Sequence, residues 1–446
     1  MSIRRWLWFI FTALVSGALL ATAGAMIALS ASWDSADPVA AISADEDILK
    51  WGRPALDLGA NSASVVWAGS TITPGIYTAQ RVGGAWVKDF MSATLTAWAP
   101  DIAASGEKTI KAWMHGGEHL NPAEPWSLVV QVGNGAVETI ATDLYGEGLP
   151  SVAIGDRGFH LVCAATDAKS ATGAFYPDLY YTYRAFDATG WSPLQVVVSH
   201  DAVLAENAIA GGVENARVAL TGSTIHVVWE QKQIVFAGSP QLEHSIWHIA
   251  GTLIGGDVDW GTPTRLSPAD QRITARPSLA AGEDGRVFVA WTELVGLRGN
   301  PEAQHVHYRA LDDAEWMPLN PPGQPIRVNG RLPNKAAVAI AVHDDVVCAV
   351  WHGYYDGDPD TLEDIHLRCS HDGGETWGTP MIVSESGGSL SSIFPTLGFD
   401  DRGRVHVTWT DYLLEKTGFV PYQVLYRRGE VWEGGLVFLP LVKRSP

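Results

Sequence analysis

An all-β fold made of repeated four-stranded units is predicted by three features of the sequence. A short apolar run that ends in tryptophan recurs after residue 50, and these tryptophans are Trp67, Trp113, Trp229, Trp291, Trp351 and Trp409. Cys163 takes the tryptophan position in a seventh run. A second set of tryptophans follows further along the units, at Trp86, Trp191, Trp260, Trp316, Trp377 and Trp432. Turn formers are frequent, with 46 glycines and 25 prolines.

Each unit has the same order of strand and turn signals. An apolar stretch, commonly after proline, leads through a tight turn such as residues 282–285 to the strand that ends in tryptophan, as in residues 405–409. A third strand, and a fourth after the second tryptophan, complete the unit. Apolar residues alternate as strands require, and no stretch after residue 50 has sustained helical periodicity. Four short strands repeated roughly every 40 to 65 residues are typical of β-propeller blades. We expect seven blades, or six if the first unit is only a partial sheet.

The composition fits a folded protein with an acidic surface. Hydrophobic residues make up 46% of the chain and charged residues 18%, which excludes a disordered chain. The formal net charge is −19, so nucleic acid is not an expected partner, because phosphate binding needs concentrated positive charge. Three cysteines cannot form a disulfide framework. A bridge between Cys348 and Cys369 is left open, and a redox or zinc role is not expected.

The N-terminus carries the signals of an exported protein. Arg4 and Arg5 precede an uncharged run over residues 6–33, and acidic residues follow it. The run is long enough to span a bilayer, and it also contains small-residue sites near Ala23 that fit signal-peptide cleavage. The charge distribution places the bulk of the chain outside the cytoplasm, secreted or anchored through this segment alone. We expect a hydrophobic helix that is a signal peptide or membrane anchor over residues 1–33, a linker over 34–48, the propeller over 49–440 and a tail over 441–446.

One segment of the sixth unit matches a family motif. Residues 370–377 read Ser-His-Asp-Gly-Gly-Glu-Thr-Trp, which resembles the Asp-box, S-x-D-x-G-x-T-W, of the sialidase superfamily and related propellers with BNR repeats. In such a hairpin turn the aspartate accepts backbone N–H groups and a glycine takes a positive φ. The resemblance implies a structural role, at the end opposite the active-site face, for Ser370, Asp372, Gly374, Thr376 and Trp377.

A candidate binding site follows from where the strands begin and end. In a blade the first strand starts on the face where the second strand ends, and the long loops begin on that face too. Basic residues stand near the start of four first strands: Arg53, Arg217, Arg276 and Lys335. Histidine or acidic residues follow five second strands: His115, Glu230, Glu293, His352 and Asp411. Converging arginines can bind a carboxylate through paired hydrogen bonds, and the three arginines of sialidases are similar, so we expect a glycan or another anionic ligand here.

The sequence lacks one part of a sialidase-like catalytic site. The resemblance implies a carboxylic acid/base in a first-blade loop and a tyrosine nucleophile, but the loop after Trp67 has no carboxylate before Asp89. Candidate catalytic residues elsewhere are Glu230, Glu293, Asp411 and Tyr354. The predicted function is an exported, sialidase-like propeller that binds a glycan or anionic ligand, with glycoside hydrolase activity left open. The alternative is a non-catalytic scaffold that binds protein partners through its long loops.

The densest acidic loop contains Asp356, Asp358 and Asp360. Alternating carboxylates can bind calcium in exported proteins, but Pro359 stiffens this loop and the glycine of an EF-hand loop is absent. A solvated acidic loop and a calcium site both remain open, and no other cofactor is expected. No nucleotide-binding or serine-hydrolase motif occurs in the strand–helix context that it requires.

Overall fold

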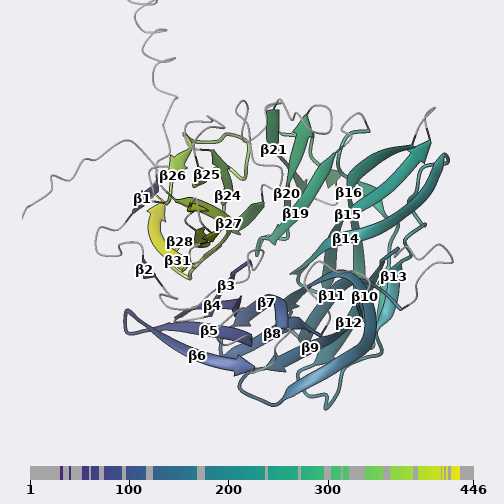
Figure 1. Ribbon diagram of the computed structural model, residues 1–446, viewed down its shortest axis with the longest axis horizontal. Helices are drawn as coiled ribbons and strands as arrows, with labels where there is room; N and C mark the ends of the chain where they lie inside the picture. Colours follow the sequence, from purple (N-terminus) through teal and green to yellow (C-terminus); the bar gives the residue numbers. More distant parts are fainter. Residues whose placement is uncertain are drawn as a thin grey trace, which may run out of the picture.

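Antiparallel sheets dominate the computed structural model of the chain (Figure 1). It describes residues 31–33, 40–41, 53–59, 62–69, 75–92, 97–116, 124–167, 176–236, 240–269, 273–295, 303–312, 315–320, 337–354, 362–384, 390–412, 414–415, 418–419 and 423–431. These residues contain strands and turns but no helix, as the sequence predicts for the region after residue 50. A helix able to cross a membrane is therefore not among them.

The strands follow the chain from sheet to sheet. The first sheet consists of β3 (Ala55–Gly59), β4 (Ser62–Gly69), β5 (Gly75–Val82) and β6 (Ala85–Ser92). The next sheet has seven strands: β7 (Ala97–Ser105), β8 (Lys108–His115), β9 (Trp126–Val132), β10 (Val137–Ile154), β11 (Gly158–Thr166), β12 (Asp178–Ala185) and β13 (Gln195–Val198). It is followed by the sheet of β14 (Ala208–Thr221), β15 (Thr224–Phe236), β16 (Pro240–Ile254), β17 (Asp257–Trp260) and β18 (Thr264–Arg265).

Three further sheets and a small ribbon complete the described structure. One contains β19 (Thr274–Ala281), β20 (Val287–Val295), β21 (Ala303–Asp312) and β22 (Glu315–Trp316). Another contains β23 (Val338–His343), β24 (Val346–Tyr354), β25 (Glu363–Ser370) and β26 (Met381–Ile382). The last contains β27 (Ser391–Phe399), β28 (Arg404–Tyr412) and β31 (Gln423–Val431), with β1 (Ala31–Trp33) and β2 (Ala40–Ala41) on β31. The ribbon pairs β29 (Leu414–Glu415) with β30 (Gly418–Phe419).

The first strands of successive sheets contact one another in a closed ring. Contacts run from β3 through β7, β10, β14, β19, β23 and β27 and return to β3. Figure 1 views this ring end-on, with the sequence colours progressing around it. The long strand β10 pairs with β9 over residues 137–144 and with β11 over residues 145–154, so the seven-stranded sheet turns from one sector of the ring into the next. This arrangement is that of a β-propeller, as predicted from the repeats.

The two sets of tryptophans explain the packing of the sheets. The first set lies in the second strands, where Trp67, Trp113, Trp229, Trp291, Trp351 and Trp409 are each 1% exposed or less. Cys163, in the same position of β11, is also buried. The second set packs edge-on against the third strand of the preceding sheet: Trp260 on Tyr181 at 5.3 Å, Trp316 on His248 at 5.0 Å, Trp377 on Tyr308 at 5.3 Å and Trp86 on Tyr426 at 4.8 Å. The contact of Trp86 with Tyr426 joins the first sheet to the last and so closes the ring.

Two short strands come from residues expected to precede the propeller. β1 pairs with the end of β31, from Gly429 to Val431, and β2 pairs with Leu425 and Tyr426. Residues 31–33, expected in the signal or anchor segment, and residues 40–41, expected in the linker, therefore form the outer edge of the last sheet. Residues 1–30 and 432–446, including the expected N-terminal helix and tail, lie outside the described residues.

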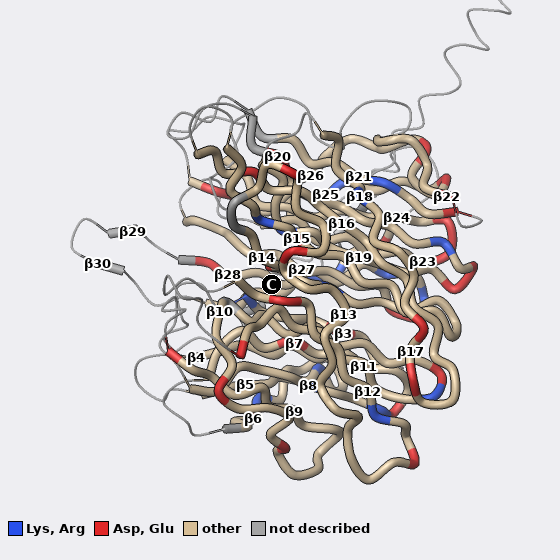
Figure 2. Tube along the Cα trace, turned by 90° about the vertical axis from the view of Figure 1, so that its right-hand side faces the viewer, with Lys and Arg blue, Asp and Glu red and all other residues tan. Residues whose placement is uncertain are grey.

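The ring has two different ends. We call the end where first strands begin and second strands finish the mouth end, and the opposite end the turn end. Figure 2 views the ring from the side with the turn end at the right, where Asp and Glu (red) are frequent near β17, β22 and β23. Cys348 and Cys369 lie directly opposite each other on β24 and β25 and form a disulfide with a Cα–Cα distance of 4.1 Å. The bridge that the sequence left open is thus present.

Candidate functional site: the axial mouth

Five first strands contain a β-bulge at the mouth end, among the residues that the structure describes. The central residue of each bulge has a positive φ, and these residues are Ala99, Leu149, Asn215, Arg276 and Phe394. For residues other than glycine this conformation is uncommon and costs about 1 kcal/mol or more. Bulges re-aim the side chains around them. The bulges therefore decide which side chains face the axis.

Side chains from the preceding second strand of the ring hold three of these bulges. Each acceptor comes directly after a second-strand tryptophan. Met114 Sδ accepts the N–H of Leu149 at 3.4 Å, Glu230 Oε2 that of Arg276 at 3.1 Å, and His352 Nδ1 that of Phe394 at 3.3 Å. A backbone N–H that leaves the ladder in a bulge needs a partner of this kind when it is buried. The contacts tie each bulge to the second strand that precedes it in the ring.

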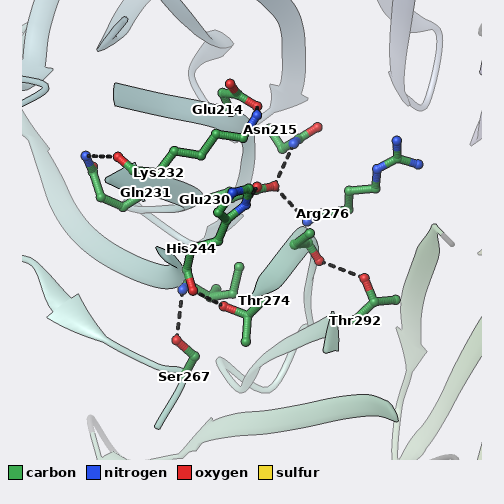
Figure 3. A network of polar contacts seen from close by, with 12 residues as sticks. Glu214, Asn215, Glu230, Gln231, Lys232, His244, Ser267, Thr274, Arg276 and Thr292 are labelled. Atoms are coloured by element: carbon green, nitrogen blue, oxygen red, sulfur yellow. Dashed lines mark hydrogen bonds and ion pairs between the residues drawn. The ribbon is translucent and has the colours of Figure 1, made fainter. Parts of the chain in front are cut away.

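Glu230 is the centre of the largest of these networks (Figure 3). Its carboxylate also accepts a hydrogen bond from Asn215 Nδ2 at 2.8 Å and lies 2.6 Å from His244 Nδ1. The side chain is only 2% exposed, and burial alone would raise its pKa. The hydrogen bond and charge of His244, with the charge of Lys232, outweigh burial and hold the pKa of Glu230 well below its usual value. Glu230 is therefore ionised, and it positions Arg276 through the backbone.

Two arginines converge over one aromatic ring. The Cζ atom of Arg53 lies 5.5 Å from the centroid of the Phe394 ring, and that of Arg276 lies 5.6 Å from it. His352 packs edge-on against the same ring at 5.5 Å and accepts the Phe394 N–H. Figure 3 shows the Arg276 side chain extending away from the Glu230 network. The sheets that carry Arg53 and Arg276 are far apart in the sequence, and Phe394 brings the two guanidinium groups together.

A cavity of about 250 Å³ lies on the axis of the ring, and every strand of the inner ring lines it. Arg53 lies at its rim, and Arg217 and Asp101 line its wall. Asp101 accepts the N–H of Val152 at 3.0 Å. Burial raises the pKa of Asp101, and the charge of Arg217 offsets only part of that rise. Arg53 and Arg217 thus bring two positive groups to the cavity and Asp101 one negative group, whereas Arg276 adds positive charge beside Phe394.

Arg217 differs from its expected place. The sequence alignment put it level with Arg53 and Arg276, but the positive-φ residue of its strand is Asn215, two residues earlier. Arg217 therefore occupies the place that Asp101 and Ser278 take in their own strands, inside the cavity. Arg217 pairs with Val228, the residue before Trp229, as Ser278 pairs with Ala290 before Trp291, so it lies on the cavity wall and not at the rim.

The second predicted set of site residues also mixes two positions. Glu230 and His352 come one residue after a tryptophan, whereas His115, Glu293 and Asp411 come two residues after one. Successive side chains of a strand face opposite sides of the sheet, so the two groups point to different sides. Of these five predicted residues, only Glu230 and His352 hold bulges of the mouth. His115 is half-buried at the end of β8.

The remaining catalytic candidates lie in different surroundings. Glu293 Oε2 is 2.5 Å from His307 Nε2, and Trp409 Nε1 donates to Asp411 Oδ1 at 2.8 Å. Burial, with a smaller contribution from the charge of Asp364, raises the pKa of Asp411 to about 6. Tyr354 ends β24 and pairs in register with Glu363. Of the candidate acids, Asp411 thus has the raised pKa that suits a general acid.

Four expected site residues lie outside the described part of the chain. They are Lys335, Asp356, Asp358 and Asp360. Within the described ranges no group of three or more histidine, cysteine or acidic side chains is arranged to hold a metal ion. The calcium alternative therefore stays a prediction.

The Asp-box residues form a hairpin turn at the turn end, as the resemblance implies. Ser370 Oγ accepts the N–H of Gly374 at 2.8 Å, and Asp372 Oδ1 accepts that of Thr376 at 2.8 Å. Burial opposes ionisation of Asp372, but the hydrogen bonds from Ser370 and Thr376 hold its pKa below the usual value. Gly374 has a φ of 91°, and a Cβ there would lie 2.3 Å from the Tyr308 hydroxyl. Trp377 packs on Tyr308, so the box fastens its sheet to the preceding one.

Several residues of the mouth were not predicted as site residues. Phe394, Asp101, Asn215 and His244 belong to this group. A proline follows four of the five bulge centres, at Pro100, Pro150, Pro277 and Pro395. This proline was a usable signal for the register of the first strands. No sequence signal marks Asn215 or His244, because their roles depend on contacts between elements.

The repeated sheets and their closed ring define a β-propeller. No family model matches the sequence, and no curated protein matches it. Among solved structures the chain is similar to the polysaccharide lyase Uly1, at 11% identity and a TM-score of 0.50 over 87% of this chain and 91% of that chain. It is also similar to the intramolecular trans-sialidase from Ruminococcus gnavus, at 10% identity and a TM-score of 0.43 over 91% of this chain and 98% of that one.

A third similar structure is the β-propeller domain of the Trilobed protease from Pyrococcus furiosus. The identity is 10% and the TM-score 0.42, over 84% of this chain and 98% of that one. At such identities the likeness concerns the fold alone. The function has to be argued from the residues of the mouth.

Proposed function

We propose that the protein is an exported, seven-bladed β-propeller that binds a carboxylate-bearing glycan, or another small anionic ligand, at its axial mouth. The observation that carries this proposal is the convergence of Arg53 and Arg276 over Phe394. Guanidinium groups bind carboxylates through paired, charge-assisted hydrogen bonds. Phe394 is only 3% exposed, so its part in the site is to hold the two guanidinium groups in place.

The blade count is supported by the inner ring. Dividing the seven-stranded sheet at β10 gives two four-stranded units, and each unit then contributes one strand to the ring. Cys163 and the six second-strand tryptophans then stand one to a blade. Export is supported by the N-terminal sequence, because cleavage near Ala23 would leave β1 in place. Anchoring without cleavage is equally compatible with the proposal.

The charges around the mouth favour an acidic over a neutral ligand. Arg217 is opposed by Asp101 within the cavity, whereas Glu230 acts on Arg276 through its backbone N–H. Positive charge is thus concentrated beside Phe394. Hydrolysis is the further part of this proposal, with Asp411 as the acid and Tyr354 beside Glu363 as the nucleophile candidate.

The test is a calorimetric titration of the full-length protein with N-acetylneuraminic acid and with glucuronic acid. We expect binding to weaken at least about tenfold in Arg276→Ala and in Arg53→Ala, because a hydrogen bond to a charged group contributes about 1.5–3 kcal/mol. Arg276→Lys should retain part of the affinity. Arg157→Ala, which removes an exposed arginine at the turn end, is the matched control and should bind normally.

Failure of the wild-type protein to bind either acid, or equal binding by all variants, contradicts the proposal. Neutral N-acetylglucosamine should bind more weakly than the acids. Release of the fluorophore from a fluorogenic sialoside, with loss in Asp411→Asn, distinguishes an enzyme from a binding protein.

A non-catalytic scaffold is the second candidate function. The hairpin of β15 and β16 reaches beyond the mouth, and Phe236 near its tip is 54% exposed. Ile234 is exposed on the same strand. Exposed apolar side chains on a projecting hairpin favour a protein partner. Loss of a partner in Phe236→Ser, with no acid binding by the wild type, would favour this candidate.

A further inference from the structure

A second cavity lies at the seam where the first sheet meets the last. It has a volume of about 540 Å³ and is lined by the β3–β4 and β5–β6 turns on one side and by the β27–β28 turn and β31 on the other. We call it the seam pocket. Leu58 and Gly59 line it, whereas Arg53 at the other end of β3 lies at the mouth. The seam pocket is therefore at the turn end, separate from the mouth.

Positive charge is concentrated in the seam pocket. Among the described residues that line it are four arginines, Arg81, Arg402, Arg404 and Arg428, against the two carboxylates of Asp400 and Asp401. This local excess stands out in a chain with a net charge of −19 and at an end where Asp and Glu are frequent (Figure 2). Arginine clusters around a concave space are typical of sites for phosphate and sulfate groups.

The arginines come from separate elements and are fixed by their neighbours. Arg404, at the start of β28, forms an ion pair with Asp400. The same carboxylate accepts the N–H groups of Arg402 and Arg404 at 3.0 Å each, which shapes the turn. Arg81 lies over the Tyr426 ring, with its Cζ 5.4 Å from the centroid. Arg402 is exposed at the tip of the turn.

His406 also lines the seam pocket, but its contacts are structural. Its Nδ1 lies 2.7 Å from the Tyr426 hydroxyl and its Nε2 lies 3.2 Å from Asp400. His160 and Tyr181 form the equivalent pair, at 2.8 Å, in a sheet that does not border this pocket. The histidine–tyrosine pair is thus a repeated packing feature, and the arginines are what distinguishes the seam.

We propose that the seam pocket binds a tetrahedral oxyanion, the phosphate or sulfate group of a larger molecule. A planar carboxylate is matched by one guanidinium fork, whereas a tetrahedral group presents oxygens to several forks at once. The volume leaves room for the sugar or glycerol that carries the group. The site is independent of the ligand proposed for the mouth.

The test measures binding of glucose 6-sulfate and glycerol 3-phosphate to the full-length protein by calorimetry, with acetate as the reference anion. We expect the esters to bind more tightly than acetate. Arg402→Ala should weaken ester binding about tenfold, because it removes one charged fork. Asp401→Asn should strengthen it, because it removes a negative charge from the pocket wall. Glucose 6-phosphate separates the two differences between these esters: compared with glucose 6-sulfate it tests the oxyanion, and compared with glycerol 3-phosphate it tests the carrier.

The chain contains a matched control for both substitutions. Residues 155–158, Gly-Asp-Arg-Gly, form the equivalent turn between β10 and β11 and do not line the seam pocket. Arg157→Ala and Asp156→Asn make the same changes in net charge and should leave ester binding unchanged. Arg276→Ala should also leave it unchanged, which separates this site from the mouth. Absence of ester binding, or equal effects of the two pairs of variants, overturns the proposal.

Discussion

Glu230 shows how a buried carboxylate can serve a binding site without touching the ligand. It was a candidate acid from its place after Trp229, but its low pKa and its contacts with Asn215, His244 and the Arg276 N–H give it a positioning role. Met114 and His352 occupy the same position, directly after a second-strand tryptophan, in other strands of the ring. The chemistry of the acceptor varies while its task stays the same.

Glu230→Ala should lower both stability and ligand affinity. Removing one partner of a buried charged network costs about 3–5 kcal/mol, and Arg276 loses the contact that holds its left-handed backbone. Met114→Leu removes the equivalent but weaker acceptor at nearly constant volume, and should cost less than about 1.5 kcal/mol. Urea unfolding measures the first effect and N-acetylneuraminic acid binding the second. Equal losses in the two variants would contradict the positioning role.

At the residue scale the sequence predicted the types of side chain in the mouth better than their exact positions. Arg53, Arg276 and His352 were expected at the mouth and lie there. Arg217 lies two residues beyond its bulge centre, and its strand lacks the proline that marks the register of the other four bulges. Phe394, which gathers the arginines, was not among the expected site residues. Its role depends on two sheets that meet only in the closed ring.

The elements are fastened to one another by repeated small contacts. In three of the five bulged strands the residue two places after the bulge centre reaches the next inner strand: Asp101 accepts the Val152 N–H, Ser151 that of Val218, and Ser278 that of Ile340. These contacts lie on the cavity wall, so the same residues shape the cavity and hold neighbouring sheets together. The Asp-box makes a comparable connection at the turn end.

The disulfide between β24 and β25 should stabilise its sheet by about 3 kcal/mol, the value expected for two cysteines separated by 21 positions in the sequence. Cys348→Ala combined with Cys369→Ala should therefore shift urea unfolding to lower concentration. A reducing agent should destabilise the wild type but not this double variant. Cys163→Ala, at a buried cysteine without a bridge, is the control and should keep the sensitivity to reductant. An insensitive wild type would contradict the expectation.

For the whole molecule, buried histidines predict loss of stability in acid. Burial lowers the pKa of His160 and His226 to about 4 and that of His248 to about 3. Between the ordinary value of 6.5 and these values, the unfolded chain takes up protons that the folded chain does not. Stability is therefore full above about pH 6.5 and falls as the pH decreases towards 4.

The paired variant His226→Gln with His248→Gln should be less stable than the wild type at pH 7.5. By pH 4.5 the difference in free energy of unfolding between the two proteins should narrow by about 2–4 kcal/mol. The variant lacks the two histidines that the unfolded wild type protonates in this pH range. Asp57 and Asp411, whose raised pKa values act in the opposite direction, are the same in both proteins. Thr221→Val removes the hydroxyl partner of His226 and keeps both histidines, so its curve should run parallel to the wild type. If the difference in free energy of unfolding between the histidine variant and the wild type is the same at both pH values, buried histidines are not the cause of the acid sensitivity.

At this scale the sequence predicted most of the architecture. The first-set tryptophans lie at matching places in separate sheets, because large buried side chains recur wherever sheets pack in the same way. The pairing of residues expected before the propeller with its last sheet was not predicted. β1 pairs with β31, and short, mostly apolar segments such as Ala31–Trp33 do not reveal a partner about 400 residues away.

The register of β1 also sets the direction in which the molecule would face on a cell. Ala31 pairs with Val431, at the turn end of the last sheet, so the chain joins the ring from that side. If residues 6–30 stay in a bilayer, the protein would stand with its arginine-lined seam towards the lipid and its axial opening towards the surroundings. Large polymers could then approach Phe394 without obstruction by the membrane.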